Sequence, residues 1–310
     1  MPAPELEPGK RLTLSKNPEP LTIAQVKLIP RESLLALFDL DGTLTEPGYQ
    51  ILMESFVREV EMGSAVVREK LINCFDKWSE GQMRYENYLV EIGELWARML
   101  SETTPKIKRS EVMQVTDKWY EDVGQKEVME YAGHMMMDLK RYEFNPVMIT
   151  GAPYEIAAPF ARHMGIQYLF AMAAELDTEE RYTGKMRRRN NTGILNNKAT
   201  ICREFGKRHL VGLAAGDTNS DFVLMEAAIN THHSKDVKGR AFLMNPKSDV
   251  LESMEGRAFH HFATGRIKAM KQGYSTEFIM EEFRDNLRRI MRDNGMGAKL
   301  RRIEGMQKTT

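Results

Sequence analysis

Residues 34–45 read LLALFDLDGTLT, an apolar run followed at once by two carboxylates, Asp39 and Asp41, and then by Gly42 and Thr43. The run has the length of a strand, and its continuous apolar character predicts burial on both faces, as in a parallel sheet covered by helices. Such sheets bind ligands at the carboxyl ends of their strands, which is where the Asp pair falls. Residues two apart on a strand point to the same side, so we expect both carboxylates to face one site.

The composition is that of a soluble globular chain. Its 310 residues are 42% hydrophobic and 28% charged, enough for one large domain or two modest ones. Lys and Arg together number 44, as do Asp and Glu, so net charge gives no reason to expect a nucleic-acid partner. No apolar window reaches the roughly 20 residues of a membrane span. Only two cysteines and no secretory signal predict a cytoplasmic protein without disulfides.

Proline content and helical periodicity divide the chain into parts. The first 33 residues hold half of the twelve prolines, a density that opposes regular structure. Apolar residues then follow a helical spacing that is broken at Gly81 and at Thr104-Pro105, which predicts an insert of several helices. The predicted parts are an N-terminal arm (1–33), a catalytic core (34–47 and 141–250), a helical cap (48–140) and a helical, basic C-terminal extension (251–310).

Strand patterns alternate with helical ones after the insert. Strands are predicted at 146–150, 167–173 and 209–215, with a helix at 154–164 and a short strand or turn at 243–246. This alternation predicts an α/β fold with a doubly wound, Rossmann-like parallel sheet. In the C-terminal extension, a four-spaced apolar stripe predicts an amphipathic helix docked on the body or on a second subunit, which would make a homo-oligomer; the stripe comprises Ile279, Phe283, Leu287 and Ile290.

Four polar clusters fall at the ends of the predicted strands or at the start of a helix. Each is a weak signal alone, but their order on alternating elements is a strong one. Converging carboxylates suit Mg²⁺, and a hydroxyl, a glycine amide and a lysine suit a phosphate group. A carboxylate beside a bound phosphate can attack phosphorus, while a second one moves the proton. The clusters are Asp39 with Asp41, Thr150 with Gly151, Lys198 in GILNNKAT, and Asp217 with Asp221 in GDTNSD.

With these four clusters, the sequence resembles the haloacid dehalogenase superfamily of phosphohydrolases. FDLDGTLT matches the first motif of that family, and the resemblance implies that Asp39 is the nucleophile and Asp41 the acid/base. Thr150 and Lys198 match the second and third motifs, and with Gly151 they are the implied phosphate-binding residues. The fourth motif matches Asp217 and Asp221. The resemblance further implies Mg²⁺ held by the Asp39 carboxylate, the Asp41 backbone carbonyl and Asp217, with Asp221 in support.

The long insert after the first strand is similar to the C1 cap arrangement of the family. The segments ITGAPYEIAAPFARHMGI, the Tyr182-Thr183-Gly184 turn and FLMNPKSDVL are similar to the phosphoserine-phosphatase-like branch, subfamily IB. Phosphoserine enzymes of that branch carry a Glu after the first motif and an Arg in the cap, but Gly48 and Ile92 stand near those positions here. The substitute candidates for substrate contacts are Glu46, Glu54, Arg58 and Arg84.

The main functional hypothesis is therefore a Mg²⁺-dependent phosphatase that hydrolyses a small phosphorylated metabolite through an aspartyl-phosphate. Two alternatives stay open from the sequence. One is a phosphotransferase that passes the phosphoryl group to an acceptor alcohol, and the other is a binding or scaffold protein that keeps the fold. The basic run Lys185–Arg189 is either a solvated loop or a contact for a second acidic group on the substrate.

Overall fold

The computed structural model of the chain describes residues 20–31, 33–46, 51–187, 194–229 and 239–307. Its centre is a six-stranded sheet in the order β3-β2-β1-β6-β7-β8, and all neighbouring strands run parallel. The α/β class predicted from the sequence is confirmed. The strands are β1 (Leu34–Phe38), β2 (Phe144–Pro153), β3 (Tyr168–Met172), β6 (Leu210–Gly216), β7 (Arg240–Met244) and β8 (Ile267–Met270).

Strand β1 is buried along its whole length because helices cover both faces of the sheet. Leu34, Ala36 and Phe38 join one hydrophobic cluster with the insert and with helices α5, α6 and α10. Leu35 and Leu37 point the other way, toward η1, α7 and α8. The covering elements are η1 (Ile23–Leu28), α5 (Glu130–Arg141), α6 (Tyr154–His163), α7 (Ile194–Arg208), α8 (Phe222–Ile229), α9 (Ser248–Ala263), α10 (Thr276–Asp293) and α11 (Gly297–Gln307).

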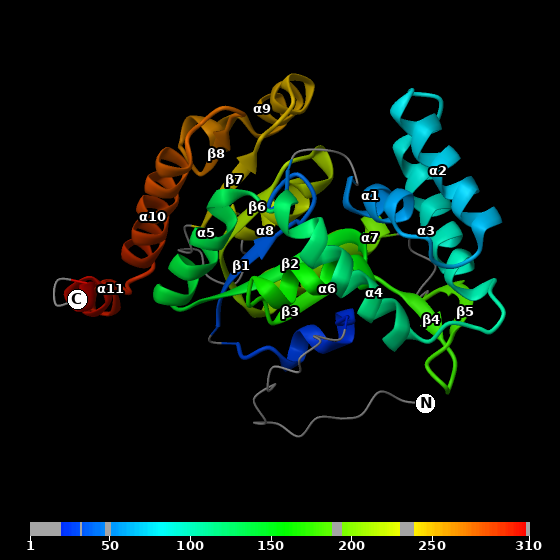
Figure 1. Cartoon of the computed structure of the whole chain (residues 1–310). Helices are drawn as coiled ribbons and strands as arrows, with labels where there is room; N and C mark the ends of the chain where they lie inside the picture. The colour runs from blue at the N-terminus through cyan, green and yellow to red at the C-terminus, as the bar shows by residue number, and fades with distance from the viewer. Residues whose placement is uncertain (1–19, 32, 47–50, 188–193, 230–238, 308–310) are drawn as a thin grey trace.

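The insert begins with four helices at one end of the molecule, opposite the C-terminal helices (Figure 1). They are α1 (Ile51–Glu59), α2 (Ala65–Ser79), α3 (Tyr85–Ser101) and α4 (Arg109–Asp122), and the short η2 (Gly124–Glu127) follows. The predicted breaks at Gly81 and Thr104-Pro105 lie between α2 and α3 and between α3 and α4. The apolar face predicted on α3 is buried, as Trp96 and Ile92 are both fully covered.

The insert shares its hydrophobic core with the sheet domain. Helix α4 lies on α6, where Tyr120 meets Phe160 edge to face and Arg162 pairs with Asp117 at 2.9 Å. Helix α3 lies on the two-stranded hairpin of β4 (Ala174–Leu176) and β5 (Tyr182–Met186). The two segments that join insert and core are themselves paired, since Thr45 forms an antiparallel bridge with Val128. The insert is therefore held to the core by packing as well as by the chain.

Several segments differ from the sequence-based expectation. Residues 267–270 form β8, which extends the sheet, although helix was predicted throughout the C-terminal extension. Residues 182–184 belong to strand β5 and not to a turn, although Gly184 has φ +86°. The predicted strand or turn at 243–246 is a strand that starts three residues earlier, at Arg240. Pairing with neighbouring strands decides these segments, and the periodicity of a short segment does not record such pairing.

Both ends of the described chain lie on the core. Val26 and Ile29 of the N-terminal arm are buried against α7, and the Leu21 amide donates to the Leu169 carbonyl at 2.8 Å. In α10 the predicted apolar stripe is buried within the chain, where the helix covers α5. The stripe is thus docked on the body, which was one of its two predicted positions.

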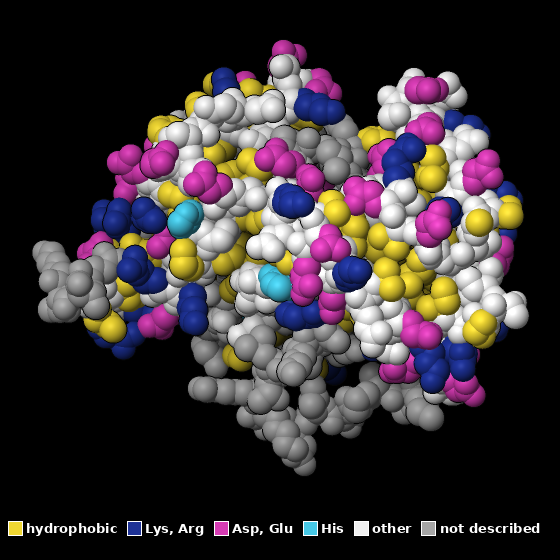
Figure 2. Space-filling view, in the orientation of Figure 1, with side chains coloured by type: hydrophobic (Ala, Val, Ile, Leu, Met, Phe, Trp, Pro, Cys, Tyr) yellow, Lys and Arg dark blue, Asp and Glu magenta, His cyan; other side chains and the backbone are white. Residues whose placement is uncertain are grey.

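None of the helices in the described part of the chain combines the length and apolarity needed to span a bilayer. On the face that Figure 2 shows, basic and acidic side chains are interspersed. Even mixing of this kind agrees with the balanced charge of the sequence.

Candidate active site

The loop after β1 forms one wall of the candidate site. The Asp39 amide donates to the Ala215 carbonyl of β6 at 3.1 Å. The amides of Thr43 and Leu44 both donate to the Leu40 carbonyl, which closes the loop into a turn. Gly42 has φ +72°, and a Cβ atom built on it would lie 2.2 Å from Oδ2 of Asp217. Only glycine therefore fits at this position, both for its backbone conformation and for the closeness of Asp217.

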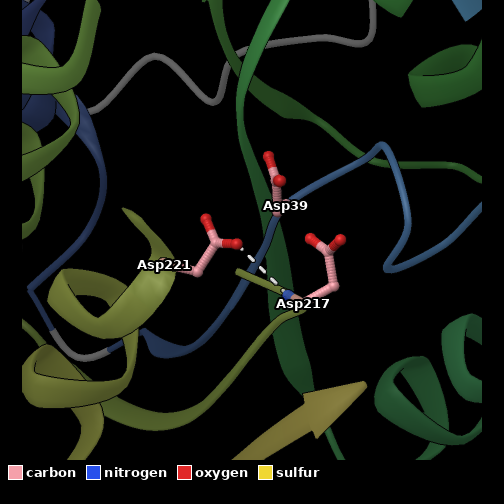
Figure 3. A group of neighbouring side chains, drawn as sticks. All are labelled: Asp39, Asp217 and Asp221. Carbon is pink, nitrogen blue, oxygen red and sulfur yellow. Dashed lines mark hydrogen bonds between the residues drawn. The ribbon is translucent and has the colours of Figure 1, made fainter. Parts of the chain in front are cut away.

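Three carboxylates meet above the ends of β1 and β6. Asp39 follows β1, Asp217 follows β6, and Asp221 lies in the short helix η3 (Asn219–Asp221) (Figure 3). One oxygen from each lies within 4.8 Å of the other two. Because β1 and β6 are parallel neighbours, their carboxyl ends meet at one edge of the sheet, as the sequence predicted for these residues.

Asp221 is fully buried and held by the loop that precedes it. Its Oδ2 accepts hydrogen bonds from the Thr218 hydroxyl at 2.8 Å and from the amides of Thr218 and Asp217 at 3.0 and 3.2 Å. A Cβ atom on Gly216 would lie 2.2 Å from the Asp221 Cβ, so the turn closes only with glycine there. These contacts orient Asp221 Oδ1 toward the remaining member of the site.

That member is Lys198 of α7, which is 6% exposed. Its ammonium lies 3.0 Å from Asp39 Oδ1 and donates to Asp221 Oδ1 at 2.5 Å. Burial lowers the pKa of this lysine, but the two carboxylates outweigh burial and hold it above the ordinary value. For Asp221 the ammonium and the Thr218 hydrogen bonds likewise outweigh burial, so its pKa lies below the ordinary value.

The other acidic groups of the site carry charge less readily. Burial, the largest effect, raises the pKa of Asp39 to about 7 against the opposing Lys198, and the charges of Asp221 and Asp41 add to the rise. Burial also raises the pKa of Asp41 to about 6. Asp217 has a pKa well above its ordinary value because of burial and of its neighbours Asp221 and Asp39. One buried ammonium thus faces an excess of carboxylates.

The residues present fit a hard divalent cation. Carboxylate oxygens from Asp39, Asp217 and Asp221 converge, and such oxygens are the ligands that Mg²⁺ prefers. Asp41 Oδ1 is buried and has no hydrogen-bond partner among the described residues. A cation would offset the surplus negative charge that raises the pKa of Asp39 and Asp217.

Thr150 and Gly151 lie at the same edge of the sheet. Met148 is paired with Phe38 across β1 and β2, so Thr150 stands two residues beyond the end of β1, level with the Asp39 loop. The Thr150 hydroxyl accepts a hydrogen bond from the Ala152 amide at 3.0 Å and is buried. In the described residues, no hydrogen bond or ion pair joins Thr150 to the carboxylates, so they share an edge without direct contact.

The cap candidates are not joined to this cluster by any interaction within the described residues. Arg58 pairs with Glu54 at 2.8 Å and with Asp76 of α2 at 2.5 Å, which links α1 to α2. Glu46 is exposed, and its amide donates to the Glu127 carbonyl. Arg84 is exposed at the start of α3.

The structure describes only one of the two positions near which the phosphoserine enzymes of the family carry substrate contacts. Ile92, near the position of the expected cap arginine, is fully buried in the core of the insert. Gly48 lies outside the described residues. In the basic run, Lys185 and Arg187 are exposed, while residues 188 and 189 also lie outside the described part.

Sequence reasoning gave no role to two residues that contact the site loop. The Thr43 hydroxyl donates to Asp217 Oδ1 at 3.4 Å, and the Tyr131 hydroxyl donates to the Thr43 carbonyl at 2.9 Å. Thr43 belongs to the FDLDGTLT motif, and this position could have marked it as a candidate site residue. Tyr131 lies 88 residues away in the chain, and no spacing rule could have connected it to the loop.

A family model for haloacid dehalogenase-like hydrolases matches residues 36–226, well over half of the chain. The chain belongs to this family. The matched range runs from β1 into α8, so it contains Asp39, Lys198, Asp217 and Asp221. The family predicted from the four motifs is therefore confirmed for this hydrolase.

Solved structures share the fold of the hydrolase at low sequence identity. A Bordetella pertussis Tohama I protein of unknown function is 18% identical with a TM-score of 0.56, covering 77% of this chain and 99% of that one. A phospho-aspartyl intermediate analogue of phosphoserine phosphatase is 17% identical with a TM-score of 0.50, covering 81% and 99%. A probable phosphoserine phosphatase from Vibrio cholerae is 14% identical with a TM-score of 0.52, covering 86% and 69%. No curated protein matches the chain significantly.

Proposed function

We propose that this hydrolase is a Mg²⁺-dependent phosphatase that acts on a small phosphomonoester through an aspartyl-phosphate on Asp39. The observation that carries the proposal is the cluster of Asp39, Asp217 and Asp221, in which the buried Lys198 pairs with Asp39 and Asp221. A protein that used the fold only for binding would have no need of three converging carboxylates and a buried lysine, so this cluster disfavours a scaffold role.

In this proposal Mg²⁺ is held by the carboxylates of Asp39 and Asp217 and by the backbone carbonyl of Asp41, with Asp221 in support. Bound there, the ion would reduce the repulsion between the attacking carboxylate and the phosphate. The chain supplies the other contacts to the phosphate oxygens, from the Thr150 hydroxyl, the Gly151 amide and the Lys198 ammonium.

The reaction then uses the two aspartates of the β1 loop in turn. An Asp39 carboxylate oxygen attacks phosphorus, the bond from phosphorus to the ester oxygen breaks, and Asp41 gives its proton to the leaving oxygen. Asp41 next takes a proton from water, whose oxygen attacks phosphorus and breaks the bond to Asp39. Phosphate and the alcohol are the products, and both carboxyl groups return to their starting states.

The proposed substrate is a small phosphorylated metabolite, and the proposed branch is the phosphoserine-phosphatase-like one with a C1 cap. Two neighbours in fold are phosphoserine phosphatases by name. The buried position of Ile92 disfavours phosphoserine itself, because no arginine can face a substrate from there. Glu46, Glu54, Arg58 and Arg84 are the proposed substrate contacts, and for Arg58 this would require release from its two acidic partners.

The division into arm, core, cap and C-terminal extension also remains our proposal, as do a cytoplasmic location and a homo-oligomer. Cys74 and Cys202 support the location because both are buried and unpaired. Burial raises the pKa of the Cys74 thiol to about 11 and that of the Cys202 thiol to about 12, so neither thiol is reactive at neutral pH.

The test is release of phosphate from p-nitrophenyl phosphate and from a panel of phosphorylated sugars, amino acids and alcohols. We expect turnover with Mg²⁺, none with excess chelator, and none with Asp39→Asn. Asp285→Asn, on the outside of α10, is the control and should keep full activity. Turnover that survives chelation or Asp39→Asn would contradict the mechanism. Transfer of phosphate to an added alcohol in place of water would identify a phosphotransferase.

A further inference from the structure

We propose that the Tyr131 hydroxyl is a positioning group for the catalytic loop, residues 39–45, and that the C-terminal extension holds this group in place. The inference rests on the proposed function in so far as the loop is catalytic. In this role Tyr131 acts through the backbone of Thr43.

The contact between Tyr131 and the loop is buried. Tyr131 is 1% exposed, Thr43 is 1% exposed, and the phenol hydroxyl donates to the Thr43 carbonyl at 2.9 Å. The side chain of the same threonine donates to Asp217 Oδ1 at 3.4 Å. Thr43 is therefore held from two sides, by Tyr131 at its carbonyl and by Asp217 at its hydroxyl. A shift of this residue would move the loop that carries Asp39 and Asp41.

Asn245 directs the hydroxyl of Tyr131 toward Thr43. Its side-chain amide donates to the phenol oxygen at 3.1 Å, so the single proton of that hydroxyl is left for the Thr43 carbonyl. Asn245 has φ +41°, a left-handed conformation that asparagine tolerates better than most residues. The backbone amide of Asn245 donates to the Met270 carbonyl of β8 at 2.7 Å. The edge strand of the C-terminal extension thus fixes the residue that orients Tyr131.

The same extension fixes helix α5, on which Tyr131 lies. The Thr276 hydroxyl, at the start of α10, donates to Oε2 of Glu130 at 2.7 Å, directly beside Tyr131 in sequence. One helical turn from the end of α5, Arg284 donates to Oδ2 of Asp138 at 2.7 Å, and Asp138 is itself buried. Asn245 and helix α5, which together place the Tyr131 hydroxyl, are therefore both anchored by residues after 263. This gives residues 267–284 of the C-terminal extension a role in positioning the catalytic loop.

Removal of this hydroxyl should affect the chemical step and not substrate binding. A catalytic carboxylate must be held close to its productive geometry, and small displacements of a nucleophile reduce turnover strongly. Tyr131→Phe keeps the ring and its packing but frees the Thr43 carbonyl. We expect kcat to fall by about tenfold, the effect of one lost buried hydrogen bond, with KM changed less than twofold.

Asn245→Gly provides a second way to disturb the same hydroxyl, because glycine accepts the positive φ without strain. If both residues act through one hydrogen-bonded chain, the double variant should lose no more activity than Tyr131→Phe alone. Tyr142→Phe is the matched control, since Tyr142 ends the same helix and is equally buried. Its kcat should stay within twofold of the wild-type value.

Amide hydrogen exchange measures the position of the loop without reference to activity. We expect faster exchange in residues 39–45 of Tyr131→Phe and of Asn245→Gly, and unchanged exchange there in Tyr142→Phe. Wild-type kcat together with wild-type exchange in Tyr131→Phe would overturn the inference, as would additive losses in the double variant. If the wild-type protein has no phosphatase activity, the proposed function is contradicted instead. The exchange rates would then be the only test of the role of Tyr131.

Discussion

The ammonium of Lys198 lies 3.0 Å from Oδ1 of Asp39, and both side chains are buried. The same ammonium reaches Asp221 Oδ1, so one cation from α7 faces two carboxylates that follow the neighbouring strands β1 and β6. Lys198 therefore stabilises the site even before any ligand binds. It is the main positive charge that offsets the carboxylates in this part of the structure.

Lys198→Met should destabilise the protein strongly in the absence of metal. The variant leaves Asp39 and Asp221 buried without their cation, and breaking such a pair costs about 3–5 kcal/mol in the free energy of unfolding. Urea unfolding in chelator measures the change. Lys207→Met, on the exposed side of the same helix, is the control and should shift the free energy by less than about 1 kcal/mol. Equal stability of the two variants would show that the pairing of Lys198 is not structural.

Gly42→Ala should cost both stability and activity. Its Cβ would fall 2.2 Å from Asp217 Oδ2, in addition to the strain of a positive φ. Gly81→Ala is a matched control, because Gly81 has φ +73° and no heavy atom within 4 Å of the added Cβ. Backbone strain alone costs about 1–2 kcal/mol. We expect that loss in Gly81→Ala with activity kept, and a larger loss without measurable turnover in Gly42→Ala. Wild-type turnover in Gly42→Ala would mean that Asp217 need not hold its position.

Glu155 should make the stability of the protein depend on pH. It is buried at the start of α6, where it accepts hydrogen bonds from Trp96 of α3 at 3.2 Å and from Tyr182 of β5 at 2.9 Å. Burial raises the pKa of this carboxyl above its ordinary value of 4.5, although both hydrogen bonds oppose the rise. A carboxyl that binds its proton more tightly when folded stabilises the protein fully below pH 4.5. That contribution is lost as the pH rises toward the folded pKa.

The measurement is the free energy of unfolding of the wild type and of Glu155→Gln from pH 4 upward. Glutamine does not titrate, so the wild type should lose stability relative to the variant as the pH increases. Loss in the opposite direction, toward acid, would show that the pKa of Glu155 is lowered by its two donors. Parallel pH profiles would show that Glu155 has the same pKa folded and unfolded.

Local patterns were enough to predict the central strand and the convergence of the candidate carboxylates at one edge of the sheet. Both faces of β1 are apolar because helices cover both faces of the sheet. The parallel pairing of β1 with β6 then brings Asp39 and Asp217 to one edge. The helices of the insert were predictable because Trp96 and its neighbours recur at helical spacing. Strand β8 was not, since four residues at a sheet edge are too few to show a period.

By itself, the sequence determined the family and the order of the chemical groups along the chain, because these depend on residue type and short-range spacing. Only the tertiary structure decided which groups touch. It placed Lys198 between Asp39 and Asp221, buried Ile92 in the core of the insert, and brought Tyr131 and Asn245 to Thr43. Contacts between residues far apart in sequence arise from the packing of whole elements against one another, and packing leaves no periodic signal in the residues that meet.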